Sequence, residues 1–372
     1  MKKLGFGTMR LPMPDPKVQG QVNVELTCEM VDRFLQQGYT YFDTAYFYHD
    51  HQSECVVREA LVKRHSRDSF LLADKLPISF LKNADEAKQE AVFNEQLEKC
   101  GVEYFDYYLL HCLTKDNYAV AQRLDTFNYL LGKKAEGKIR HLGFSFHDNA
   151  QLLDQILTEH PEVEFVQLQI NYLDWEDERI QSRKCWEVAR RHGKDVIVME
   201  PVRGGKLAAV PEEVTGMMKA AHPDWSPASW AIRFCAGLDG VIMVLSGMSD
   251  MAQVEDNTSF MHDPAPLTAE ELAIVEKAAE IISALPAVNC TACRYCEAAC
   301  PRSIPIADLF ALYNGDQAAL RRGEAPDRAT YAKLCEENAS PTLCVECKGC
   351  EAACPQHLPI VNWLKRVQNT YK

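Results

Sequence analysis

The feature that most restricts this 372-residue chain is a pair of cysteine runs near its C-terminus. The first run is Cys290, Cys293, Cys296 and Cys300, followed by Pro301; the second is Cys344, Cys347, Cys350 and Cys354, followed by Pro355. Both read C-x2-C-x2-C-x3-C-P, which is the ligand spacing of bacterial-type [4Fe–4S] proteins. Two residues between ligands allow a tight turn to direct three thiolates at one cluster, and the fourth Cys usually binds the other cluster.

The sequence therefore predicts two [4Fe–4S] clusters with crossed ligands. Cluster one takes Cys290, Cys293, Cys296 and Cys354, and cluster two takes Cys344, Cys347, Cys350 and Cys300. Zinc is the alternative metal, although zinc sites favour paired C-x2-C units, often with His. A disulfide framework would need an oxidising compartment, and the N-terminus has no signal-peptide pattern. We expect a cytoplasmic protein whose other cysteines are small buried hydrophobes.

The overall charge argues against two classes of partner. The formal net charge is −13, so neither nucleic acid nor an anionic membrane surface has electrostatic support. The sequence has no uninterrupted apolar run of membrane-spanning length. We therefore expect a small-molecule substrate and, because of the clusters, a possible redox partner protein such as a ferredoxin or a flavoprotein.

Apolar strand-like runs alternate with amphipathic helix-like segments from residue 4 to about residue 260. Eight predicted strands, each followed by a helical stretch, match the size and order of a (β/α)8 barrel. Continuous apolar runs such as 196–199 and 241–245 suit parallel strands buried on both faces. A doubly wound sheet is the alternative, but it would normally carry a Gly-rich dinucleotide fingerprint after its first strand, and none is found.

The chain changes character after a Pro-rich break at 263–267. Thr268 and Glu271 have the spacing of a helix capping box, which predicts a linker helix to about residue 285. The long, helix-patterned stretch between Cys300 and Cys344 separates the two runs much more than in a compact β-type ferredoxin. The tail resembles an α-helical ferredoxin domain. We place the barrel at 1–265, and the linker helix with the iron–sulfur domain at 266–372.

Polar side chains follow three neighbouring predicted strands. The second strand ends at Asp43 and is followed by Tyr48, the third ends at Lys75, and the fourth ends at His111. The C-terminal strand ends of such a barrel share one mouth, where catalytic groups gather. A Tyr can give a proton to a carbonyl oxygen as hydride arrives, a Lys held by an Asp lowers the Tyr pKa, and a His donates to the oxyanion. Taken alone, the Lys and Asp could equally be a structural ion pair.

At these residues the chain resembles the aldo-keto reductase family. The resemblance rests on the segments 4–12 and 43–48, on Lys75 and His111, and on the segments 142–145 and 246–249. The family's catalytic Asp, Tyr, Lys and His correspond in order to Asp43, Tyr48, Lys75 and His111. The whole chain is similar to the subgroup with a C-terminal ferredoxin extension, including the segment 199–205 after the seventh strand.

The resemblance implies a nicotinamide cofactor across the barrel mouth. Its candidate contacts are Thr8, Asp43, Ser145, Gln167, Arg203, Ser246, Gly247, Ser249, Gln253 and Asn257. Ser145 and Gln167 would hold the carboxamide, and the loop after the eighth strand would meet the pyrophosphate and adenosine. The usual nicotinamide-stacking aromatic corresponds to Met199, and the usual 2′-phosphate-binding pair corresponds to Gly247 and Gln253. The choice between NAD and NADP therefore stays open.

The resulting prediction is an oxidoreductase that reduces a carbonyl or oxidises an alcohol and is coupled to two clusters. Nicotinamide moves two electrons as hydride, whereas each cluster moves one, so a direct link needs an intermediate such as flavin. The alternatives are a ferredoxin- or flavin-linked reductase that does not use free NAD(P)H, and an electron-transfer subunit whose barrel is only a scaffold. A regulatory protein that senses nicotinamide or oxidation is a further alternative.

Overall fold

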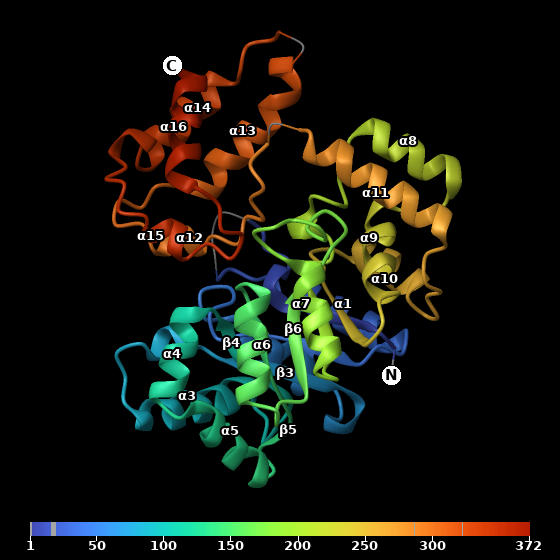
Figure 1. The fold of residues 1–372 in the computed structure, drawn as a ribbon, viewed down its shortest axis with the longest axis vertical. Helices are drawn as coiled ribbons and strands as arrows, with labels where there is room; N and C mark the ends of the chain where they lie inside the picture. Colours follow the sequence, from blue (N-terminus) through green and yellow to red (C-terminus); the bar gives the residue numbers. More distant parts are fainter. Residues whose placement is uncertain (1, 16–19, 286, 322) are drawn as a thin grey trace. The chain divides into compact units, whose positions relative to one another are not determined.

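In a computed structural model the N-terminal part of the chain forms a closed barrel of eight parallel strands in sequence order, with β1 pairing β8 (Figure 1). The structure describes residues 2–15, 20–285, 287–321 and 323–372. The strands are β1 (Leu4–Gly7), β2 (Tyr41–Asp43), β3 (Leu71–Leu76), β4 (Phe105–Leu113), β5 (Ile139–Phe146), β6 (Phe165–Gln169), β7 (Asp195–Met199) and β8 (Val241–Gly247). The predicted (β/α)8 barrel is confirmed, and the doubly wound alternative is excluded.

The inside of the barrel is filled by one face of the strands. Tyr41, Ala73, Leu109 and Phe165 belong to one buried cluster contributed by different strands. A Cβ at Gly143 of β5 would lie 2.4 Å from the carbonyl oxygen of Phe165, so only glycine allows this close approach. Side chains two residues apart on a strand share a face. The residues that follow these core positions by two toward the C-terminal strand ends therefore also point into the barrel.

Helices follow the strands, and amphipathic ones such as α1 and α6 bury an apolar face. They are α1 (Val24–Gln36), α2 (Ser53–Val57), α3 (Glu86–Cys100), α4 (Lys115–Arg123), α5 (Thr126–Ala135), α6 (Ala150–Glu159), α7 (Ser182–Arg191), α8 (Glu212–Ala221), α9 (Pro227–Ala236), α10 (Met251–Phe260) and α11 (Ala269–Ser283). Asn23, Asp85 and Ser226 cap the first turns of α1, α3 and α9 through their side-chain oxygens. The predicted capping box is present: Thr268 N–H donates to Glu271 at 2.7 Å, and Glu271 N–H donates to Thr268 Oγ1 at 3.3 Å.

Two helical regions differ from the sequence prediction. The sequence pattern of residues 117–136 predicts one long helix, but the structure divides this segment into α4 and α5, because Asp125 adopts a left-handed conformation with φ 49°. The second region is α8 (Glu212–Ala221), which was not predicted from the sequence and has Gly216 near its middle. Glycine lowers intrinsic helix propensity by about 1 kcal/mol relative to alanine, so this helix has a weak local signal.

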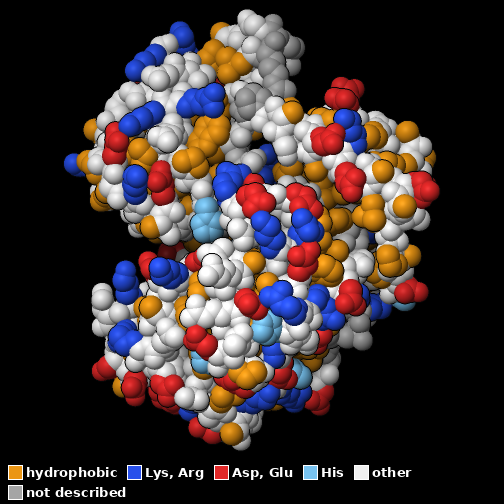
Figure 2. Space-filling view, viewed as in Figure 1, with side chains coloured by type: hydrophobic (Ala, Val, Ile, Leu, Met, Phe, Trp, Pro, Cys, Tyr) orange, Lys and Arg blue, Asp and Glu red, His pale blue; other side chains and the backbone are white. Residues whose placement is uncertain are grey.

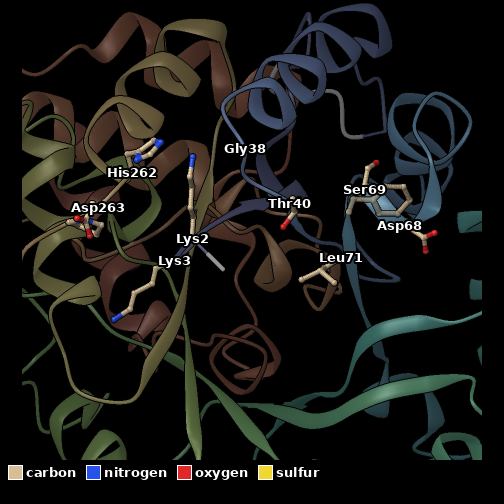
Figure 3. Close-up of a pocket in the computed structure, with 11 residues that line it drawn as sticks. Lys2, Lys3, Gly38, Thr40, Asp68, Ser69, Leu71, His262 and Asp263 are labelled. Atoms are coloured by element: carbon tan, nitrogen blue, oxygen red, sulfur yellow. The ribbon is translucent and has the colours of Figure 1, made fainter.

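A cavity of about 760 Å³ opens at the N-terminal ends of the strands, lined in part by Lys2, Lys3 and His262 (Figure 3). The two lysine side chains extend in different directions from the start of β1 (Figure 3). Lys2 Nζ donates to the carbonyl oxygen of Gln37 at the end of α1 (2.5 Å), and Lys3 Nζ donates to that of Ala236 at the end of α9 (3.1 Å). A cation at a helix C-terminus offsets its partial negative charge, so both lysines stabilise helix ends.

The chain divides into two compact units: residues 1–202 with 216–275, and residues 203–215 with 276–372. The second unit is helical. It contains α12 (Tyr295–Ala298), α13 (Ile306–Arg321), α14 (Arg328–Glu337), α15 (Gly349–Ala352) and α16 (Ile360–Tyr371). The short α12 and α15 lie inside the two cysteine runs and pack on each other, while α13 packs on α14 and α16 (Figure 1). Phe310 and Leu364 share its buried core with Cys296 and Cys350.

Surface charge is distributed rather than concentrated over the barrel unit. On the face shown in Figure 2, acidic and basic side chains are interspersed over this part of the chain. Opposite charges also form ion pairs within this unit, such as Arg183 with Glu176 (2.8 Å) and Arg33 with Glu255 (2.6 Å). Within the described residues, no helix has both the length and the apolar character needed to cross a membrane.

Candidate active site

The four side chains predicted at the strand ends meet at the C-terminal mouth of the barrel. Asp43, Lys75 and His111 each follow an interior core residue of the same strand by two positions, so they point inward. Lys75 Nζ donates to Asp43 Oδ1 and to the carbonyl oxygen of Thr44, both at 2.6 Å. The Tyr48 hydroxyl lies 3.5 Å from the same nitrogen. The ammonium therefore sits between a carboxylate and a phenol.

His111 lies beside Tyr48, with ring centroids 6.2 Å apart in an edge-to-face arrangement. The His111 side chain is buried, and its Nδ1 has no hydrogen-bond partner within the described part of the chain. Burial, followed by the charge of Lys75, lowers the pKa of His111 well below its usual value of 6.5. His111 is therefore neutral at neutral pH, and a neutral imidazole can still donate one hydrogen bond.

The expected net lowering of the Tyr48 pKa toward the working range is wrong. Burial, with smaller contributions from the negative charges of Asp43 and Glu200, raises the pKa of Tyr48 well above its usual value of 10. Asp43 offsets the effect of the ammonium because it is held at 2.6 Å from Lys75. Tyr48 therefore keeps its proton at neutral pH, which suits a proton donor rather than a base.

Two further predicted residues lie next to each other on adjacent strands. Ser145 of β5 pairs with Gln167 of β6, and both side chains are buried. Gln167 Nε2 donates to Asp43 Oδ2 at 3.2 Å, and Ser145 Oγ accepts from the Cys112 N–H at 2.7 Å. The hydroxyl proton of Ser145 and the amide oxygen of Gln167 have no hydrogen-bond partner among the described residues. Together they offer one donor and one acceptor, which matches the edge of a primary amide.

The predicted residues around β8 form a local network. Asn257 Nδ2 donates to Ser246 Oγ at 2.8 Å, and both side chains are buried. Gln253 accepts from the Ser249 N–H through its Oε1 at 2.8 Å. Ser249 Oγ donates to the carbonyl oxygen of Arg10 at 2.8 Å. These contacts fix the loop after β8 against the loop after β1.

The remaining predicted contacts are less directly placed. A Cβ on Gly247 would lie 3.1 Å from the Arg10 side chain, so the glycine leaves room for that arginine. Thr8 is buried, and its hydroxyl donates to the carbonyl oxygen of Asp43 at 3.0 Å. This hydrogen bond stabilises the C-terminal end of β2. Arg203 is buried in the segment that belongs to the second unit.

Arg10 and Glu200 are residues at the mouth that the sequence analysis did not select. Arg10 Nη2 lies 3.8 Å from Glu200 Oε1, and Glu200 follows β7 directly with φ 57°. The charge of Glu200 is one of the causes that raise the pKa of Tyr48, so this carboxylate is near the phenol. The sequence could have indicated Glu200 only through its position directly after a predicted strand. Its left-handed backbone conformation cannot be predicted from sequence.

The eight cysteines of the two runs fall into the two crossed groups. Burial is the main cause that raises the pKa of Cys296, and the thiols of Cys293, Cys290 and Cys354 also raise it, in decreasing order. These four cysteines are therefore close to one another. The remaining four line a single small cavity: Cys300, Cys344, Cys347 and Cys350. The two runs approach each other closely at Gly349, where a Cβ would lie 3.1 Å from the carbonyl oxygen of Ala299 in the other run.

Both runs have the same unusual backbone. Ala292 and Arg294 in the first run have φ 54° and 62°, and Glu346 and Lys348 at the corresponding positions have φ 55° and 59°. Left-handed residues other than glycine are uncommon and cost free energy, so their repetition indicates a shared requirement of the loop. The Ala292 N–H also donates to Cys290 Sγ at 3.3 Å, the type of hydrogen bond that tunes cluster sulfurs.

No group of three His, Cys, Asp or Glu side chains in the described residues is close enough to bind one metal ion. A [4Fe–4S] cluster is larger, and each of its irons takes one thiolate, so four cysteines must surround a cluster-sized space instead of converging on a point. The cavity among Cys300, Cys344, Cys347 and Cys350 has this character, and these residues fit a cluster better than a single zinc ion.

Comparison with known proteins agrees with both units. The profile of the Aldo/keto reductase family matches residues 3–280. The chain belongs to the aldo/keto reductase family. In addition to this reductase barrel, residues 289–358 match the 4Fe-4S dicluster domain. The predicted combination of a reductase barrel with a ferredoxin-type tail is confirmed.

Individual relatives resemble only parts of this reductase. Norsolorinic acid reductase stcV of Emericella nidulans is 27% identical over 154 residues, which is 38% of each chain. Norsolorinic acid reductase B of Aspergillus parasiticus is 25% identical over 154 residues, covering 38% of this chain and 39% of the relative. The matched region thus spans well under half of these curated relatives.

Solved structures match the barrel over a longer stretch. The holo form of an aldo-keto reductase from Bacillus halodurans is 25% identical, with a TM-score of 0.59, covering 74% of this chain and 91% of the other. An aldo-keto reductase from Klebsiella pneumoniae, solved in complex with NADPH, is 20% identical with a TM-score of 0.55, covering 74% and 90%. The latter likeness supports the fold alone.

Proposed function

We propose that this protein is an oxidoreductase that reduces a carbonyl group, or oxidises the corresponding alcohol, at the C-terminal mouth of the barrel. The observation that supports it is the arrangement of Lys75 between Asp43 at 2.6 Å and the Tyr48 hydroxyl at 3.5 Å, with His111 beside the phenol. Acid, charge and hydrogen-bond donor are thus within reach of one small carbonyl group.

Tyr48 is the proton donor in this proposal. Its pKa is raised, so the phenol is protonated throughout the neutral range, and Lys75 stabilises the phenolate that remains after proton transfer. Asp43 orients Lys75 through the 2.6 Å contact. Neutral His111 donates a hydrogen bond to the carbonyl oxygen, where negative charge develops in the transition state.

The donor and acceptor offered by Ser145 and Gln167 fit the carboxamide of a nicotinamide, which would supply the hydride when bound. Arg10, Ser249 and Gln253 surround the loop where the phosphates of such a cofactor would lie. Membership of the aldo/keto reductase family supports this choice. The Arg10 side chain lies against Gly247 in this loop, and we propose that it faces phosphate.

We further propose that the two groups of cysteines hold [4Fe–4S] clusters that exchange single electrons with a partner. The match of residues 289–358 to a dicluster domain and the crossed grouping of the thiols support this. Hydride transfer moves two electrons and each cluster moves one, so coupling the two sites requires a carrier able to do both, such as a flavin. Anaerobic purification with identification of bound flavin or nicotinamide tests this link.

The decisive test of the barrel chemistry is Tyr48→Phe, assayed with 4-nitrobenzaldehyde and NADPH or NADH. We expect kcat to fall by about 10²–10⁴-fold, the usual contribution of general acid catalysis. The control is Tyr46→Phe, because Tyr46 is also buried but its hydroxyl contacts Glu95 at 3.3 Å instead of Lys75. Equal activity of the two variants would contradict the proposal.

A second outcome would support a different function. If the wild-type protein binds nicotinamide but turns over no carbonyl in a broad panel, the barrel would be a sensor or a docking scaffold. Tyr48→Phe and Tyr46→Phe would then be indistinguishable in every assay, while the visible absorption of the clusters would be unchanged in both.

A further inference from the structure

The two cysteine runs are internal repeats beyond their ligands. Glu297 Oε1 accepts from the Ala307 N–H at 2.9 Å, and Glu351 Oε1 accepts from the Val361 N–H at 3.0 Å at the corresponding positions of the second run. The left-handed residues also repeat, as described above. Residues at matching positions of the two runs can therefore be compared directly, and any difference between them needs its own explanation.

The first run is covered by another segment of its own unit. The residues on either side of Cys290 are Asn289 and Thr291. Lys206 Nζ donates to Asn289 Oδ1 at 2.7 Å, and a Cβ on Gly204 would lie 2.7 Å from the carbonyl oxygen of Thr291. The loop 203–206 thus lies directly on these flanking residues, and Thr291 is 3% exposed.

Among the described residues, no segment covers the second run in this way. Leu343 and Val345 flank Cys344 at the positions that Asn289 and Thr291 occupy in the first run. They are 53% and 52% exposed, and they are two of only four large hydrophobic side chains exposed among the described residues. Cys347, the next ligand candidate, is itself exposed. The two residues that flank the first cysteine are thus polar in the covered first run and apolar in the exposed second run.

Basic side chains outnumber acidic ones around this apolar pair, and Glu346, which follows Val345, is paired with Lys365 at 2.7 Å. Arg302 and Lys348 line the cavity among the second group of cysteines, and both side chains are exposed. The matching residue of Lys348 in the first run is Arg294, which is neutralised by Glu297 at 2.9 Å and Asp308 at 2.6 Å. No ion pair is found for Lys348 among the described residues. A basic rim around an apolar centre fits a partner with an acidic rim.

We propose that Leu343 and Val345, with the rim of Lys348 and Arg302, form the docking surface for an acidic one-electron carrier protein of the ferredoxin class. This inference rests on the proposed clusters. Cys344, Cys347, Cys350 and Cys300 would hold the cluster that accepts one electron from the reduced [2Fe–2S] centre of the carrier, a transfer that changes no bond and moves no proton. Docking here brings the carrier to the more exposed of the two cysteine groups, which shortens the transfer distance.

The test is isothermal titration of the air-protected, cluster-loaded protein with an oxidised, acidic [2Fe–2S] ferredoxin. The key variant is Leu343→Asn combined with Val345→Thr, which gives the second run the residues that already fold in the first run. We expect its Kd to rise about tenfold or more, because truncating a central apolar contact removes a hot spot. Lys348→Glu should also weaken binding and reduce its dependence on salt.

Matched controls are Leu272→Asn, at an exposed leucine of α11, and Lys333→Glu, at an exposed lysine of α14. Both should bind the ferredoxin like the wild type. Absence of binding by the wild type, or equal binding by all variants, overturns the docking surface. Loss of concentration-dependent self-association in the double variant, without any ferredoxin binding, would assign the surface to a second copy and also overturn it. Iron content and visible absorption distinguish these failures from a protein that never held clusters.

Discussion

At the scale of single residues, the mouth of the barrel is notable for groups whose pKa values are moved away from neutrality. Burial lowers the pKa of His111 well below 6.5 and raises that of Tyr48 well above 10. If neutral His111 is the hydrogen-bond donor and protonated Tyr48 the acid, neither changes its charge between these two values. We expect kcat for carbonyl reduction to be flat from about pH 6.5 to pH 10, measured at saturating substrate.

His111→Ala should reduce kcat by about 10²–10³-fold, the usual effect of removing one oxyanion donor, with a smaller effect on nicotinamide affinity. A useful control is His141→Ala, since His141 lies on β5 and contacts Glu164 at 2.8 Å. A large loss of nicotinamide affinity with an unchanged kcat would mean that His111 positions the cofactor instead of the carbonyl.

Two buried carboxyl groups, those of Asp74 and Glu54, make stability depend on pH. Asp74 and Glu54 are fully buried; Asp74 Oδ1 accepts from the Lys75 N–H at 2.8 Å, and Lys99 Nζ lies 3.3 Å from Glu54 Oε2. Burial, followed by the charge of Glu54, raises the pKa of Asp74 well above its usual value of 3.8. The folded protein therefore holds a proton that the unfolded chain releases.

This contribution to stability is fully present below pH 3.8, the unfolded-state value, and is lost as pH rises through the raised folded-state pKa of Asp74. Asp74→Asn keeps an acceptor for the Lys75 N–H but cannot ionise. We expect its free energy of unfolding, measured with urea, to fall less than that of the wild type as pH rises from 4 toward neutrality. Asp116→Asn, at an exposed position of α4, should follow the wild-type curve.

Residue identities at the site were largely accessible from sequence, but their electrostatics were not. Asp43, Lys75 and His111 could be selected because inward-facing polar residues at strand ends follow from the barrel pattern. The direction of the Tyr48 pKa could not, because it depends on burial and on Glu200, which is brought near only by the closed barrel. Arg10 was missed for the same reason, since its contacts are with the loop after β8.

At the scale of elements, regular periodic segments were predictable and their interruptions were not. Strands such as β7 and β8 follow from continuous apolar runs, and the alternation of strand-like with helix-like segments predicts the order of all eight. The break between α4 and α5 depends on one left-handed residue, Asp125, within an otherwise helical pattern. The assignment of residues 203–215 to the second unit depends on contacts with residues 289 and 291, far away in sequence.

The loop after β7 provides a paired test of that assignment. Gly204 and Gly205 both have positive φ, at 63° and 93°, but only Gly204 is in close contact: a Cβ would lie 2.7 Å from the carbonyl oxygen of Thr291. At Gly205 no atom lies within 4 Å of such a Cβ. Gly205→Ala should therefore cost only the backbone strain, about 1–2 kcal/mol, whereas Gly204→Ala must also displace the residue after Cys290.

We expect Gly204→Ala to lose bound iron faster than Gly205→Ala when both are incubated with a chelator, because Thr291 follows a proposed cluster ligand. Iron is measured by a colorimetric assay, and the visible absorption of the clusters is followed in parallel. Equal rates of iron loss for the two variants would mean that the contact between Gly204 and Thr291 does not support the first cluster.

At the scale of the whole molecule, the two units depend on different sources of stability. The barrel closes its own hydrogen-bonding sheet and buries core residues from all eight strands. The second unit has a smaller core in which Cys296, Cys350 and Cys354 are themselves members, packed with side chains such as Phe310 and Leu364. If these thiolates bind clusters, cluster binding is part of the folding free energy of this unit.

Iron removal should therefore separate the two units. Anaerobically purified protein should contain about eight irons per chain, four for each of two clusters. Chelation should unfold much of the second unit, seen as loss of part of the helical circular dichroism signal and as rapid proteolysis after about residue 275, while the barrel stays resistant. The barrel should keep its affinity for nicotinamide in the same sample. A protein that loses its iron without any change in proteolysis would show that the helical unit folds by its apolar core alone, and that its cysteines are free to serve electron transfer without supporting the fold.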